Sequence, residues 1–84
     1  MIKYAFSGST EDRRTRGHKL HYEGMVVVVQ DKSKGRFHTS YIIHLHDGHG
    51  KALTTDRTVP VVGEFSTEEE ALNAGLEHAK HYFH

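Results

Sequence analysis

The side chains with the most chemical potential lie in residues 37–46, where apolar and polar residues alternate at the two-residue period of a β-strand. Imidazoles can hold a metal, move a proton or bond a partner, so the histidine-bearing face of this strand is the first candidate for a binding surface. That face carries His38, Ser40, Ile42, His44 and His46. The opposite face is predicted to belong to the core, and it consists of Phe37, Thr39, Tyr41, Ile43 and Leu45.

Two of these histidines have a spacing that suits a metal ion. His44 and His46 are at positions i and i+2, so their Cα atoms should lie about 6.6–6.8 Å apart with both rings on one side. A third ligand would have to come from Asp47 or His49 in the following turn, or from a neighbouring strand, because His38 is about 20 Å back along the strand. Two ligands do not make a site. We therefore expect no cofactor, and expect the histidines to be solvated or to contact a partner; a histidine-based metal-binding protein that uses His44, His46 and His49 is an alternative.

Catalytic motifs are absent from the sequence. Ser40 with His38 or His44 could be a nucleophile with its base, but the i, i+2 spacing only places these side chains next to each other, with no oxyanion site. There is no phosphate-binding loop, nucleophile elbow or dinucleotide fingerprint. The sequence therefore predicts that the protein is not an enzyme.

Length and composition indicate one small domain over residues 1–84. There is no cysteine, so a disulfide framework and a thiolate metal site are excluded. The longest apolar run, residues 25–29, is far too short to span a bilayer, and the first residues do not resemble a signal peptide. We expect a soluble, cytoplasmic protein that does not enter a membrane.

Residues 7–19 are polar and lack apolar periodicity, which predicts a mobile basic loop or arm. Arg13, Arg14 and Arg16 give this segment its charge, and it is a candidate for contact with phosphate or with an acidic partner. With the basic turn at residues 32–36, it supports an alternative function, a nucleic-acid-binding regulator. Eleven basic and eleven acidic residues cancel in the whole chain, however, and such a balance is unusual for a dedicated nucleic-acid binder.

The remaining patterns predict strands over residues 21–30, 37–46 and 58–65, with residues 2–6 as a possible fourth, edge strand. Pro60 favours an edge position for the 58–65 strand. A helix begins after a capping box, either Ser66 with Glu69 or Thr67 with Glu70. Its apolar stripe is centred on Leu72, Gly75, Leu76, Ala79 and Phe83, with Ala71 and Tyr82 at the margin.

The predicted fold is α+β, an antiparallel meander of three or four strands with a C-terminal helix packed on one face. The other face of the sheet is then uncovered, with Ile42 and part of the 26–29 run exposed among the histidines. An apolar patch of this kind usually marks an interface. The sequence therefore predicts a small non-catalytic binding module whose open face meets another protein or a second copy of itself.

Two segments carry a resemblance to known proteins. Tyr22-Glu23-Gly24 opening a strand and Phe65-Ser66-Thr67-Glu68-Glu69-Glu70-Ala71 opening the helix resemble small bacterial β-β-β-α proteins, over residues 20–83. The resemblance implies this element order and no particular activity. The order is also similar to the latter part of double-stranded-RNA-binding domains. Those domains have a basic entry to the final helix, whereas this helix begins with three glutamates.

Overall fold

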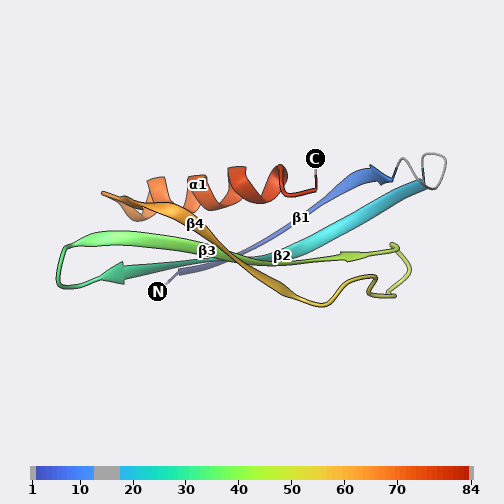
Figure 1. Ribbon diagram of the computed structural model, residues 1–84, viewed down its shortest axis with the longest axis horizontal. Coiled ribbons are helices and arrows are strands. Elements are labelled where there is room, and N and C mark those ends of the chain that lie inside the picture. The colour runs from blue at the N-terminus through green and yellow to red at the C-terminus, as the bar shows by residue number, and fades with distance from the viewer. Residues whose placement is uncertain (1, 13–17, 84) are drawn as a thin grey trace.

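The computed structural model describes residues 2–12 and 18–83 (Figure 1). The elements are β1 (Ile2–Asp12), β2 (His18–Asp31), β3 (Arg36–His46), β4 (Arg57–Phe65) and α1 (Glu68–Lys80). The four strands form one antiparallel sheet in chain order, and α1 lies along one of its faces. The fold is therefore α+β, and the sheet includes the N-terminal strand, β1, that the sequence patterns predicted only as a possible fourth strand.

β1 is longer than the sequence patterns predict. Residues 7–12 and 18–19, expected to belong to a loop or arm, are in β1 and β2. The physical reason is cross-strand pairing, which continues from Ser7 opposite Glu23 to Asp12 opposite His18 without needing apolar alternation. Gly8 helps, because a Cβ there would overlap the ring of Tyr22, which lies over the glycine from the next strand. Residues 13–17 lie outside the described part of the chain, and they include Arg13, Arg14 and Arg16, the arginines of the predicted arm.

The core lies between the sheet and α1. Its largest fully buried side chains come from the two central strands and are Val26, Val28, Tyr41 and Ile43. From the helix, the buried residues are the small ones, Ala71, Gly75 and Ala79, while Leu72 and Leu76 are only partly buried. The buried stripe is thus rotated slightly relative to the predicted one, because Ala71 lies at its centre and not at its margin. Small residues occupy the centre because they let the helix backbone approach the sheet closely.

Local signals set the ends of the elements as predicted. The side chain of Thr67 caps α1 by accepting a hydrogen bond of 3.1 Å from the backbone N–H of Glu70, which selects the second capping-box register. Gly35 takes a φ of 67° in the turn between β2 and β3. β4, which contains Pro60, is an edge strand.

α1 covers only part of the sheet. Thirteen helical residues span about 20 Å, whereas the fourteen residues of β2 span about 46 Å. In Figure 1 the hairpin of β1 and β2 extends past the C-terminal end of α1 on the right. None of the described residues form a helix that is long and apolar enough to cross a membrane.

Candidate functional site

The candidate site is the open face, defined here as the sheet face that points away from α1. Residues directly opposite each other in an antiparallel pair share a face, so the strand register assigns every side chain of the sheet to one side. All five predicted binding residues of β3 lie on the open face, and they are His38, Ser40, Ile42, His44 and His46. The register also places the side chains of Thr39, Tyr41 and Ile43 on the helix side, where they are buried.

An apolar row crosses the middle of the open face. Ala5 of β1 is opposite Met25 of β2, which is opposite Ile42 of β3, which is opposite Thr58 of β4. Met25 and Ile42 are 37% and 36% exposed, large values for side chains of this kind in the middle of a sheet. Among the described residues, no helix covers them (Figure 1).

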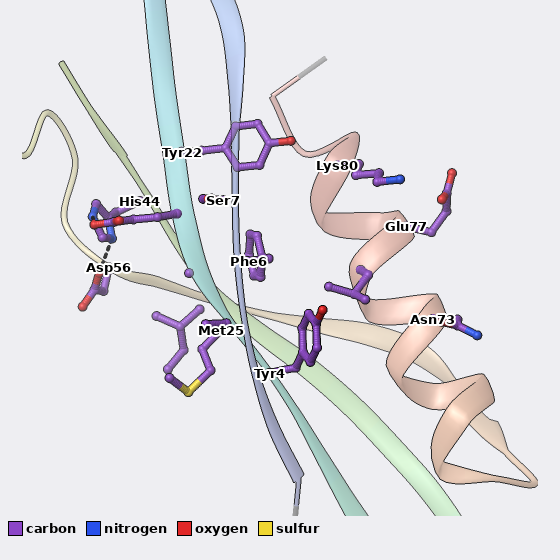
Figure 2. A pocket seen from close by; sticks show the side chains of 15 residues that line it. Tyr4, Phe6, Ser7, Tyr22, Met25, His44, Asp56, Asn73, Glu77 and Lys80 are labelled. Carbon is purple, nitrogen blue, oxygen red and sulfur yellow. Dashed lines mark hydrogen bonds and ion pairs between the residues drawn. The ribbon is translucent and has the colours of Figure 1, made fainter. Parts of the chain in front are cut away.

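A charged row lies next to the apolar row, centred on His44. The Nε2 atom of His44 is 2.9 Å from Oε1 of Glu23, its neighbour across β2, and Nδ1 is 2.9 Å from Oδ1 of Asp56 in the loop before β4. Figure 2 shows His44 and Asp56 joined on the side of the sheet away from the helix. Both ring nitrogens of His44 are therefore close to a carboxylate oxygen, and the contact with Glu23 is a hydrogen bond.

Paired imidazoles form a third row. The rings of His21 and His46 are opposite each other and stacked, with centroids 5.5 Å apart. Nδ1 of His46 accepts a hydrogen bond of 3.2 Å from the backbone N–H of Gly48, so the ring proton is on Nε2, which is 3.9 Å from Oε2 of Glu23. His46 is therefore fixed in one tautomer.

These contacts engage the ring nitrogens of His44 and His46, the two histidines with a spacing that suits a metal ion. Both ring nitrogens of His44 face carboxylates, and the Nδ1 lone pair of His46 accepts a hydrogen bond from a backbone N–H. His49 is an exposed turn residue whose backbone N–H donates to Asp47. Within residues 2–12 and 18–83, no group of three or more His, Asp or Glu side chains is placed to hold a metal ion.

The far end of the open face has a different character. Nε2 of His38 is 4.0 Å from Glu64, and the same carboxylate is 3.8 Å from Nζ of Lys34 and 3.7 Å from Nε of Arg36. Ser40 lies between Val27 and Pro60, and in the described chain it has no hydrogen bond to a histidine. The serine and histidine side chains of β3 therefore do not form a nucleophile and base.

The basic residues that the structure describes do not come together into one surface. The turn that carries Lys32 and Lys34 is at one end of β2, and Asp12 and His18, which flank the undescribed segment 13–17, are at the other. These two ends are about 46 Å apart along the strand. Lys34 and Arg36 are, in addition, partly neutralised by Glu64.

Sequence reasoning did not find Glu23, Asp56 or the partly buried contact of Tyr41 with His78. The hydroxyl of Tyr41 lies 2.6 Å from Nδ1 of His78 on α1, and burial raises the pKa of this phenol. The alternation of β3 placed Tyr41 in the core, but only the packed helix shows which group satisfies its hydroxyl. Glu23 could have been found from the strand register, whereas Asp56 lies in a loop with no periodic signal.

Comparisons with protein-family models, with curated proteins and with solved structures find no match for this chain.

Proposed function

We propose that the protein is a non-catalytic binding module and that its open face binds another protein. The observation that carries this proposal is the exposed apolar row of Ala5, Met25 and Ile42 in the middle of an uncovered sheet. Covering apolar surface contributes about 25 cal/mol per Å² removed from water, so this row favours association. An apolar centre beside charged side chains is also the usual composition of a protein–protein interface.

The charged row gives the surface its specificity. Glu23 and Asp56 hold His44 from both sides, so a partner meets side chains that are already ordered. Ordered side chains lose less conformational entropy on binding than free ones do. A partner with an apolar centre and basic groups opposite Glu23 and Asp56 would match the open face best.

Nucleic acid fits the open face less well than protein does. Its charged side chains include the carboxylates Glu23, Asp56 and Glu64, which repel phosphate. Of the described basic groups, Lys32, Lys34 and Arg36 lie at one end of β2, Lys19 lies near the other end, and Lys3 is next to the apolar row. We therefore place nucleic-acid binding second.

Photo-crosslinking from single positions would test the proposal. A photoreactive amino acid at Ile42 should capture a partner protein in cells, and the same probe at Glu69, exposed on the helix, should not. The captured protein is then purified, and its Kd is measured with the parent and with a Met25→Lys variant. We expect Met25→Lys to weaken binding at least tenfold. Leu53→Lys, which removes an apolar side chain that is 47% exposed in a loop, is the matched control and should leave Kd unchanged.

Two results would contradict the proposal. One is equal capture from Ile42 and Glu69, or a Kd that does not respond to Met25→Lys. The other is an amide-shift titration in which short single- or double-stranded oligonucleotides move the signals of Lys32, Lys34 and Arg36, with an affinity that falls steeply with added salt. That second result would make nucleic-acid binding the function.

A further inference from the structure

The two edges of the sheet differ in how well they are protected from pairing with another strand. β4 contains Pro60, and its register with β3 shifts between Phe37 and Thr39, close to Gly63 with its φ of 121°. Proline and irregular register are two of the features by which natural sheets block their edges. β1 has neither, since it contains no proline and pairs with β2 in an unbroken register from Ile2 to Asp12. Its outer edge is open to a further strand.

The surface around β1 is hollowed on both sides of the strand. A cleft is lined on the helix side by Tyr4, Phe6 and Leu76, and on the open face by Ala5 of β1 and Met25 of β2. Figure 2 shows Tyr4 and Phe6 projecting from β1 on the side of the helix, with Asn73, Glu77 and Lys80 beyond them. Tyr4 is 50% exposed although it is a large aromatic residue. A strand that added to this edge would cover Tyr4 and Phe6.

The sequence of β1 is complementary to itself in the antiparallel direction. Lys3 and Glu11 are both exposed on the open face, and neither forms an ion pair with another described residue. Ser7 is midway between them. When two copies of β1 pair antiparallel about Ser7, Lys3 of each copy is therefore directly opposite Glu11 of the other. Opposite charges in directly facing positions stabilise a strand pair.

The helix side of the same register brings aromatic side chains together. Phe6 of one copy comes opposite Gly8 of the other, and the ring of Tyr22 already lies over that glycine from β2. Within each copy the rings of Phe6 and Tyr22 are 6.4 Å apart between centroids, so Phe6 of the second copy would extend this aromatic group. Pairing about Ser7 therefore joins opposite charges on one face and aromatic rings on the other.

We infer that β1 pairs antiparallel with the β1 of a second copy, in the register centred on Ser7, so that one sheet runs through a two-fold symmetric dimer. A two-fold axis through Ser7 makes both Lys3–Glu11 contacts equivalent, as closed symmetry requires. The open faces of the two copies become one continuous surface. This surface is separate from the edge itself, so the dimer does not depend on the open face being a binding site for another protein.

Charge reversal tests the register. Mass measurement by light scattering over a dilution series should show a dimer for the parent. Lys3→Glu and Glu11→Lys each replace two attractive contacts with two repulsive ones, and each should weaken dimerisation about tenfold. The double variant Lys3→Glu, Glu11→Lys restores both contacts and should dimerise like the parent. A parent that is monomeric throughout, or a double variant as weak as the singles, would overturn the inference.

Cross-linking tests the position of the axis independently. The chain has no cysteine, so a single introduced thiol can be oxidised only against a second copy. Ser7→Cys would face its own copy across the axis, with Cβ atoms about 4.5–5.5 Å apart, and should form a covalent dimer rapidly under mild oxidation. Ser9→Cys is the matched control, because Ser9 lies two residues from the axis and the two thiols would be about 13 Å apart. Faster cross-linking of Ser9→Cys than of Ser7→Cys would show that the register is wrong.

Discussion

Replacing Gly75 by alanine should destabilise the protein, although alanine is the better helix former. Gly75 is a buried helix residue, and a Cβ built on it would lie 2.7 Å from Cγ1 of Val26 and 2.8 Å from Oγ1 of Thr39. Ordinary van der Waals contact begins at 3.4 Å, so the neighbours or the helix must move by about 0.6–0.7 Å. Val26 and Thr39 are 0% and 4% exposed, so both side chains are enclosed by the core.

The magnitude follows from two opposing effects. Alanine in place of glycine inside a helix contributes about 0.8–1 kcal/mol of stability. Forcing an extra methyl group into a packed core costs about 1–3 kcal/mol, and two close contacts with immobile side chains place this site near the upper end. We therefore expect Gly75→Ala to lower the free energy of unfolding by about 1–2 kcal/mol.

Chemical denaturation followed by circular dichroism would measure this effect. Asn73→Ala is the control, because it raises helix propensity at an exposed position of the same helix and should stabilise the protein by a few tenths of a kcal/mol. In a Val26→Ala background, which removes the closer of the two contacts, Gly75→Ala should cost less. A higher unfolding midpoint for Gly75→Ala in the parent, or the same cost in both backgrounds, would refute the close approach of α1 to β2.

Three further outcomes are expected. Burial raises the pKa of the Tyr41 phenol in the folded protein above its unfolded value of about 10. The stability that this group contributes is complete below about pH 10 and is lost as pH rises through the folded pKa. Above about pH 10, the free energy of unfolding should therefore fall less steeply in Tyr41→Phe than in the parent. The hydrogen bond from the backbone N–H of His49 lowers the pKa of the Asp47 carboxyl in the folded protein. This carboxylate therefore stabilises the fold above its unfolded pKa of about 3.9, and the stabilisation is lost as pH falls through the folded pKa. An NMR titration should find the midpoint of Asp47 below that of a free aspartate. Thr67→Ala should cost about 1 kcal/mol in urea denaturation, whereas Ser66→Ala, one residue before the cap, should cost less than half as much.

Local patterns predicted those parts of the fold that depend on residues close in the sequence. The helix start was visible because Thr67 and Glu70 are three residues apart and form the cap themselves. The alternation in residues 37–46 separated the buried Tyr41 from the exposed Ile42, because a strand sends successive side chains to opposite faces. In both cases, all the residues that make up the pattern belong to a single helical turn or a single strand.

Features that depend on pairing partners could not be predicted in the same way. The second half of β1, residues 7–12, has no apolar residues, and it is a strand because residues 18–23 of β2 pair with it. The charged row needs Glu23, His44 and Asp56, which come from three separate segments. The centre of the helix face was missed for a different reason, since an apolar scale ranks Leu72 above Ala71, while close packing requires the smaller side chain.

The order of elements along the chain affects how the protein is made. Each strand pairs with the one synthesised just before it, so the sheet can assemble by short-range steps as the chain lengthens. α1 comes last, and at about 5–20 residues per second its thirteen residues follow the sheet by roughly a second or more. During that interval Val26, Tyr41 and Ile43 lack their cover, and both faces of the sheet present apolar side chains. The nascent chain is therefore most exposed to chaperones and to aggregation just before its helix emerges.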